Sequence, residues 1–255
     1  MKHRKPGLPT VDLFAGAGGL SLGLEAAGFR PIAAIESDRA ASATYRAWHP
    51  GAEVIEADMA TVDFEAFRGR FALVAGGPPC QPFSVGGKRL AAIDPRNGIP
   101  QFLRAVAQIQ PTAVLMENVA GLAASTKRAY LESILVGLEE IGYSTAWRVL
   151  QAADYGVPQK RERLFLVGSR DGRFVFPPPT HGADAPLPHP VAGSVIDPYR
   201  PVGELNPAIV TYARRPSLRP GPYHGHLYNG GGRPIELSEP APTMLASMGG
   251  NKTPW

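Results

Sequence analysis

The sequence predicts an α/β fold with a mostly parallel sheet and helices on both faces, followed by a small irregular β-rich domain. Three observations support this prediction. Short β-branched or aliphatic runs alternate with amphipathic stretches through residue 170, a glycine-rich turn follows the first run, and the composition changes near residues 171 to 180. Such alternation is typical of βαβ units, in which crossover helices join parallel strands.

The runs expected to form strands are 10–14, 31–37, 52–58, 71–77, 113–119 and 163–169. The clearest helical patterns are LSLGLEAAG at 20–28 and LESILVGLEEIG at 131–142. The chain has 255 residues, of which 44% are hydrophobic, and this suits one domain with a sizeable core plus part of a second. We therefore expect a first domain over residues 1–170 and a second over 171–255.

The tail from residue 171 differs in composition from the rest of the chain. It holds 16 of the 27 prolines and shows no helical periodicity of useful length. This tail contains seven Lys or Arg and six Asp or Glu, so its composition alone does not indicate a nucleic-acid-binding segment. Disorder is the simplest interpretation of a tail rich in proline and glycine, but spaced tyrosines favour a small irregular β domain.

The composition also narrows the class of protein. A single cysteine excludes an internal disulfide, and no run of about eighteen apolar residues or signal-type start occurs. These features predict a cytoplasmic protein, associated with the nucleoid if the source is bacterial. The net charge of +4 is compatible with a polyanionic partner, although it is also ordinary for an enzyme. The six histidines are scattered, so we expect no metal site.

The segment TVDLFAGAGGLSLGLEAAG predicts a strand, a turn and a helix. Gly16, Gly18 and Gly19 allow a ligand to approach the backbone at the helix N-terminus, although such a turn can also bind nothing. Glu36, at the end of the second strand, can accept hydrogen bonds from ribose hydroxyls, and Asp58, at the end of the third, can meet an adenine amino group.

The glycine pattern departs from a dinucleotide fingerprint. Position 21, where the third glycine would stand, is Ser. A nucleoside cofactor without a pyrophosphate, such as S-adenosylmethionine, therefore fits better than a nicotinamide dinucleotide.

The only cysteine lies in GGPPCQPFS, directly after an apolar strand. A lone cysteine is usually a buried small hydrophobe. Here the flanking prolines rigidify the loop, and Gln81 and Ser84 keep it polar, which suits a nucleophile better than a core position. Cys80 is therefore a candidate nucleophile at the carboxyl edge of the sheet.

Two further segments carry candidate catalytic residues. Glu117 ends the apolar run AVLMENV, where it either forms a salt bridge or acts as a general acid whose pKa an apolar cleft would raise. In QKRER, the residues Gln159, Arg161 and Arg163 alternate, so they are expected to share one face, although a solvated charge run is the simpler interpretation of that segment alone.

Taken together, DLFAGAGGLSLG, GGPPCQPFS, ENV and QKRER, in this order and spacing, resemble the C5-cytosine DNA methyltransferases over about residues 9–255. The pair PPCQPFS and ENV is highly specific, whereas many methyltransferases share the glycine loop. The segment from Gly225 to Trp255 is similar to the recognition domain of some members. The resemblance implies a Rossmann-like, S-adenosylmethionine-dependent catalytic domain over 1–170 and a target recognition domain over 171–255.

The resemblance also implies the chemistry. The Cys80 thiolate would add to carbon 6 of cytosine while Glu117 protonates or hydrogen-bonds ring nitrogen 3, so that carbon 5 can accept the methyl group. Arg163 would steady the base at its exocyclic oxygen, with Arg161 toward phosphate. Because these atoms are stacked inside duplex DNA, the target cytosine must be flipped out of the double helix.

In the same way Phe14 would pack on the adenine, Glu36 would hold the ribose, and Asp58 would meet the adenine amino group. The full set of expected cofactor contacts is Phe14, Gly16, Ala17, Gly19, Glu36, Asp58, Met59 and Pro79. The expected DNA contacts are Gln81, Ser84 and Gln159.

Two alternatives remain at this point. One is an RNA cytosine methyltransferase of the same fold, but that branch typically carries a Cys-Phe-Thr signature, which this sequence lacks. The other is a non-catalytic DNA-binding remnant. In the family two further motifs follow the recognition domain, and this sequence stops before both. We therefore expect the chain alone to be inactive or weak, and either a second polypeptide that supplies those motifs or a longer gene.

Overall fold

The computed structural model describes residues 7–79, 97–195, 218–220, 227–229 and 236–243. The chain divides into two compact units. Unit 1 comprises residues 1–149 and 163–176, and unit 2 comprises residues 150–162 and 177–255. The polypeptide therefore passes from unit 1 to unit 2, returns for one strand, and then enters unit 2 again.

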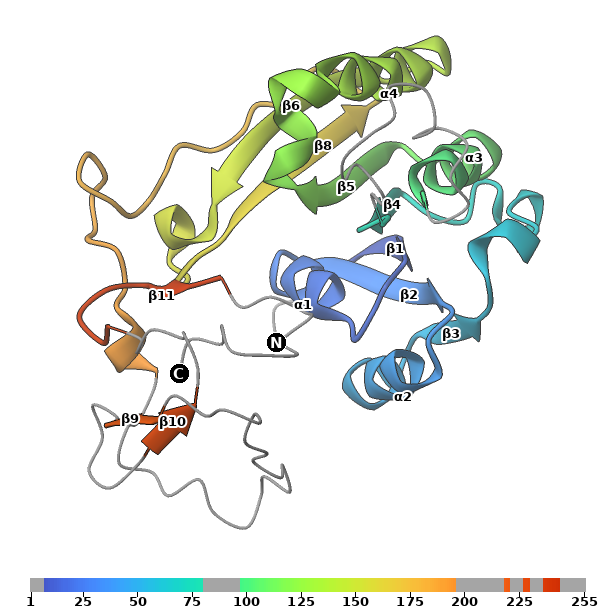
Figure 1. Ribbon diagram of the computed structural model, residues 1–255. Helices are drawn as coiled ribbons and strands as arrows, with labels where there is room; N and C mark the ends of the chain where they lie inside the picture. The colour runs from blue at the N-terminus through green and yellow to red at the C-terminus, as the bar shows by residue number, and fades with distance from the viewer. Residues whose placement is uncertain (1–6, 80–96, 196–217, 221–226, 230–235, 244–255) are drawn as a thin grey trace, which may run out of the picture. The chain divides into compact units, whose positions relative to one another are not determined.

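The central feature is a seven-stranded sheet with the order β3-β2-β1-β4-β5-β8-β6 (Figure 1). Its strands are β1 (Leu8–Leu13), β2 (Phe29–Glu36), β3 (Glu53–Glu56), β4 (Leu73–Gly76), β5 (Ala113–Val119), β6 (Ser144–Gln151) and β8 (Glu162–Ser169). β1 to β5 pair in parallel, whereas β8 runs antiparallel to β5. The mostly parallel α/β sheet predicted from the sequence is confirmed.

Among the described residues, four α-helices cover the two faces of this sheet: α1 (Gly19–Ala26), α2 (Arg39–Trp48), α3 (Ile99–Ile109) and α4 (Arg128–Glu140). Successive strand residues point to opposite faces. Leu73 and Ala75 of β4 pack with Leu24 of α1, whereas the intervening Val74 belongs to the cluster that contains α3 and α4. Ala34 of β2 lies in register with the α1 side and packs with Tyr45 of α2. Helices therefore cover both faces, as predicted.

The helices follow from local sequence. In α3, Phe102, Ala105, Val106 and Ile109 recur at helical spacing and are all fully buried. Asp38 caps α2 by accepting a hydrogen bond from the amide of Ala41 at 2.7 Å. The four helices and the apolar strand residues together supply most of the described core.

Short 3₁₀ helices occupy Met59–Thr61, Glu65–Phe67, Ala120–Ala123, Ser125–Lys127, Ala152–Tyr155 and Ala192–Ser194. Unit 2 contains β7 (Gln159–Lys160) paired in parallel with β11 (Ala241–Pro242), and β9 (Leu218–Pro220) paired antiparallel with β10 (Leu227–Asn229). Its described residues therefore form short, irregular β structure. Within the described ranges, the helices are all too short or too polar to cross a bilayer.

Candidate active site

The candidate residues of unit 1 gather where the parallel strands end. Parallel strands place their carboxyl ends at one edge of the sheet, which is where open α/β sheets bind ligands. The segments at this edge are the glycine turn after β1, Glu36 at the end of β2, Asp58 after β3, Gly77 to Pro79 after β4, and Glu117 near the end of β5.

The glycine turn exposes its backbone at two of its three glycines. A Cβ added at Gly16 or Gly19 would meet no atom within 4 Å, so a ligand could approach there. Gly18 differs, because its φ is +93° and a Cβ would lie 2.6 Å from Nε2 of His49. Gly18 was expected to make room for a ligand, but the structure requires it for packing against α2.

Glu36 holds the turn from the side. Its Oε2 accepts a hydrogen bond from the amide of Gly16 at 2.8 Å, and its Oε1 accepts one from the amide of Asp38 at the same distance. Asp58 is exposed, and its Oδ1 accepts from the amide of Ala60 at 2.8 Å. Both carboxylates thus lie at this edge of the sheet and accept hydrogen bonds from backbone amides of the chain itself, and their contacts with ribose and adenine stay predictions.

Phe14 and Pro79 come together around Gly98. A Cβ at Gly98 would lie 2.6 Å from Cδ of Pro79 and 2.8 Å from the ring of Phe14, and the amide of Gly98 donates to the carbonyl of Pro79 at 2.9 Å. The N-terminus of α3 therefore fixes two expected cofactor contacts. Ala17 is exposed, whereas Met59 is 5% exposed and belongs to the hydrophobic core.

Glu117 and Arg163 form an ion pair across neighbouring strands. Nε of Arg163 lies 3.0 Å from Oε1 of Glu117, and their side chains are 20% and 27% exposed. Glu117 was expected either to form a salt bridge or to act as a general acid, and the structure shows the salt bridge. The other carboxylate oxygen lies next to Gly77, where a Cβ would approach to 3.4 Å. The acid, the cation and the start of the cysteine loop are therefore adjacent.

Asn118 is a candidate site residue that the sequence analysis missed. Its side chain is buried, and Nδ2 donates to the carbonyl of Pro78 at 2.9 Å while Oδ1 accepts from the amide of Val119. This bond anchors the loop that leads to Cys80. The available signal was a polar amide at the end of an apolar strand. Cys80, Gln81 and Ser84 themselves lie outside the described residues.

Gln159 and Arg161 belong to unit 2, and Arg163 belongs to unit 1. Gln159 lies in β7, and its side chain donates to the carbonyl of Pro242 at 3.4 Å. Arg161 lies between β7 and β8, and its carbonyl accepts from the amide of Ala152 at 3.0 Å. The three alternating residues are each half-buried, and the prediction that they share one face stays a prediction.

A buried polar cluster lies beneath the glycine turn. Asp12 of β1 is 1% exposed, its Oδ2 accepts from the hydroxyl of Ser21 at 2.7 Å, and that hydroxyl lies 2.7 Å from the hydroxyl of Tyr45. Among the described residues, Oδ1 of Asp12 has no hydrogen-bond partner. Burial raises the pKa of Asp12 to about 7, although the Ser21 hydrogen bond and the nearby His49 oppose this rise.

This cluster predicts a pH dependence of stability. Because burial raises the pKa of Asp12 from 3.8 to about 7, the folded state binds more protons than the unfolded state between these values. The free energy of unfolding should therefore fall as pH rises through this window, and Asp12→Asn should reduce that fall by a few kcal/mol. Urea unfolding at pH 5 and pH 8 measures the difference. Asp63→Asn, at an exposed position, is the control, and equal pH slopes in wild type and Asp12→Asn would contradict the prediction.

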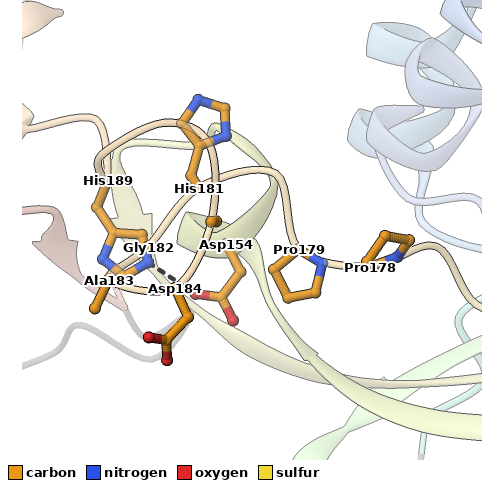
Figure 2. Close-up of a pocket in the computed structure, with 9 residues that line it drawn as sticks. Asp154, Pro178, Pro179, His181, Gly182, Ala183, Asp184 and His189 are labelled. Atoms are coloured by element: carbon orange, nitrogen blue, oxygen red, sulfur yellow. Dashed lines mark hydrogen bonds and ion pairs between the residues drawn. The ribbon is translucent and has the colours of Figure 1, made fainter.

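Unit 2 contains a separate pocket of about 350 Å³ (Figure 2). His189 Nε2 lies 2.8 Å from Oδ1 of Asp154, and the carbonyl of Asp154 accepts from the amides of Thr180 and His181. Asp154 therefore holds both ends of the loop 180–189, which lines the pocket. In the described part of the chain, no group of three or more His, Cys, Asp or Glu side chains is placed to hold a metal ion.

Comparison with known proteins places these features in context. The family model described as C-5 cytosine-specific DNA methylase matches residues 8–197. Type II methyltransferase M.AquIA from Picosynechococcus sp. is 41% identical over 189 residues, which cover 68% of this chain and 76% of that protein. Type II methyltransferase M.PspPI from Psychrobacter sp. is 47% identical over 162 residues, which cover 63% of this chain and 39% of that protein.

Two solved structures are also similar to part of this chain. A prophage-encoded protein of E. coli, described as a DNA modification methyltransferase, matches with a TM-score of 0.55 and 30% identity over 65% of this chain and 47% of that one. Spodoptera frugiperda DNMT2 matches in fold with a TM-score of 0.60 at 23% identity, over 75% of this chain and 60% of that one. The chain thus spans about half the length of most of these relatives.

Proposed function

Because this chain belongs to the C-5 cytosine-specific DNA methylase family, we propose that it transfers a methyl group from S-adenosylmethionine to carbon 5 of cytosine in DNA. The observation that carries this proposal is the ion pair of Glu117 and Arg163 beside the loop that Asn118 anchors. An acid, a cation and the approach to a lone cysteine meet there at the edge that also carries the glycine turn.

The residues at the edge suit S-adenosylmethionine. The open backbone at Gly16 and Gly19 leaves room for a ligand, and the Glu36 carboxylate is an acceptor for ribose hydroxyls. Phe14 and Pro79 offer an apolar surface for adenine, and Asp58 offers an exposed carboxylate for its amino group. When bound, S-adenosylmethionine supplies an electrophilic methyl group.

The protein side chains would prepare cytosine to accept that group. Carbon 5 is a weak nucleophile, so the Cys80 thiolate adds to carbon 6 while Glu117 delivers or shares a proton at ring nitrogen 3. The resulting enamine makes carbon 5 nucleophilic. After methylation, loss of the proton at carbon 5 expels the thiolate and restores the aromatic ring.

Arg163 has two roles in this scheme. Its guanidinium lies 3.0 Å from Glu117, where it would orient the carboxylate and reach the exocyclic oxygen of the base. A positive charge near the cysteine loop also favours the thiolate. We assign Arg161 to a DNA phosphate and Gln81, Ser84 and Gln159 to the DNA around the flipped base.

Residues 171–255 would supply target recognition, since sequence is read by side chains that reach base edges in the grooves. DNA is the proposed macromolecular partner. A second polypeptide that carries the family's closing motifs is a further proposed partner, and it can be tested directly by adding such a segment.

The activity can be tested without knowing the target sequence. The chain, alone or with the closing segment of a relative, is expressed in a bacterial host that lacks cytosine methylation, and host DNA is sequenced after bisulfite treatment. We expect 5-methylcytosine at a recurring sequence, and a covalent adduct on purified duplexes that carry 5-fluorocytosine at that position. Unmethylated DNA in both arms, from a folded chain, would refute the proposal.

A further inference from the structure

We propose that Arg104 is a positioning residue for the cofactor. It would hold the loop after β3 so that Asp58 can meet the adenine end. This inference rests on the proposed function, because it assigns Asp58 to the adenine amino group. It concerns a side chain on α3 that lies outside the motifs of the sequence analysis.

Arg104 donates to two backbone carbonyls of the loop. Its Nη2 donates to the carbonyl of Met59 at 2.6 Å, and its Nη1 donates to the carbonyl of Val62 at 3.1 Å. These carbonyls bracket the 3₁₀ turn Met59–Thr61, which Asp58 caps. One guanidinium therefore fixes both ends of the turn, and hydrogen bonds from a charged donor are stronger than neutral ones.

The guanidinium is itself restrained on α3. Nε donates to Oε1 of Gln101 at 2.7 Å, and Nη1 donates to Oε1 of Gln108 at 3.1 Å. Cζ lies 4.7 Å from the centroid of the Phe64 ring, which is fully buried. Because the planar fork is held on several sides, a lysine at this position could not satisfy both carbonyls.

The 3₁₀ turn Met59–Thr61 sets the position of Asp58. The amide of Ala60 donates to Oδ1 of Asp58, and the amide of Thr61 donates to its carbonyl at 2.9 Å. The amide of Ala57, the first residue after β3, donates to the carbonyl of Glu36 at 3.2 Å, so the start of the loop is bonded to the end of β2. A shift of the turn would therefore move Asp58 relative to Glu36, and with it the adenine contact relative to the ribose contact.

The first test needs no ligand. Hydrogen exchange of the amides of Ala60 and Thr61 is measured in wild type, Arg104→Met and Arg104→Lys. Loss of even one of the two charge-assisted hydrogen bonds to the loop should speed their exchange about tenfold, and Arg104→Met removes both. Arg128→Met is the matched control, because Arg128 also lies over an aromatic ring and pairs with Glu132 on its own helix, without a described bond to this loop.

The second test measures the adenine contact. Calorimetry compares S-adenosylhomocysteine with an analogue in which hydrogen replaces the 6-amino group of adenine. Wild type should prefer the natural ligand, and both Arg104 variants should lose about tenfold in its affinity but much less in that of the analogue, which narrows the preference. The Arg128→Met control should keep it. If Arg104→Met fails to fold, Arg104→Lys carries the comparison.

The outcomes separate the two proposals. Unchanged exchange or an unchanged preference in a folded Arg104 variant would overturn the inference and leave the proposed function intact. Equal loss of affinity for both ligands would mean that Arg104 supports the fold without placing Asp58. Failure of the wild-type chain to bind S-adenosylhomocysteine, both alone and with the closing segment of a relative, would overturn both proposals.

Discussion

Replacing Cys80 with serine is expected to abolish methyl transfer while leaving cofactor binding nearly intact. A serine hydroxyl is similar in size to a thiol but far less nucleophilic at neutral pH, so attack on carbon 6 of cytosine should stop. Transfer of a labelled methyl group to DNA measures the first effect, and calorimetry with S-adenosylhomocysteine measures the second. The assay uses a preparation in which the wild-type chain methylates DNA.

Two controls make this result specific. Cys80→Ala should be equally inactive, because it also removes the nucleophile. Neither variant should form an adduct with DNA that carries 5-fluorocytosine, whereas wild type should. Methylation at the wild-type rate by Cys80→Ser would rule out the covalent mechanism.

The second large effect is expected for Glu117→Gln, which should lower the rate of methyl transfer by about 10² or more, the usual scale for a lost general acid. The amide keeps the size of the side chain but cannot deliver a proton to ring nitrogen 3. Single-turnover rates of methyl transfer measure this loss. DNA binding, measured by fluorescence anisotropy, should change little.

The matched control is Glu132→Gln, because Glu132 also forms an ion pair with an arginine at 3.0 Å but on an exposed helix surface. It should leave the rate unchanged. If Glu117→Gln transfers methyl groups at the wild-type rate, Glu117 is not a general acid and serves only as the ion-pair partner of Arg163.

The fold could be predicted to the extent that its elements bury apolar side chains. The strand predicted over 113–119 is β5 itself, because its first four residues form an apolar run. The helix α2 was not among the predicted elements, and its packing shows why. This helix buries only Ser42 and Tyr45, so it carries no apolar stripe that a periodicity argument could find.

The candidate site divides in the same way. Glu36, Asp58 and Glu117 could be placed at the sheet edge because strand ends can be read locally from the sequence. The anchors could not, because they act over long separations in the chain. Asn118 reaches Pro78 across 40 residues, and Arg104 reaches Met59 across 45. Such contacts depend on tertiary packing, which no local pattern encodes.

Unit 2 is built from two segments that are separated in the sequence, and this has a consequence for biosynthesis. Gln159 of β7 bonds Pro242, 83 residues later, so β7 leaves the ribosome well before its partner strand. At about 5 to 20 residues per second, this interval lasts roughly 4 to 17 s. The seven-stranded sheet needs no residue beyond Ser169, so it can close during that interval. Unit 2 would then complete its own pairing of β7 with β11 only after the sheet has formed.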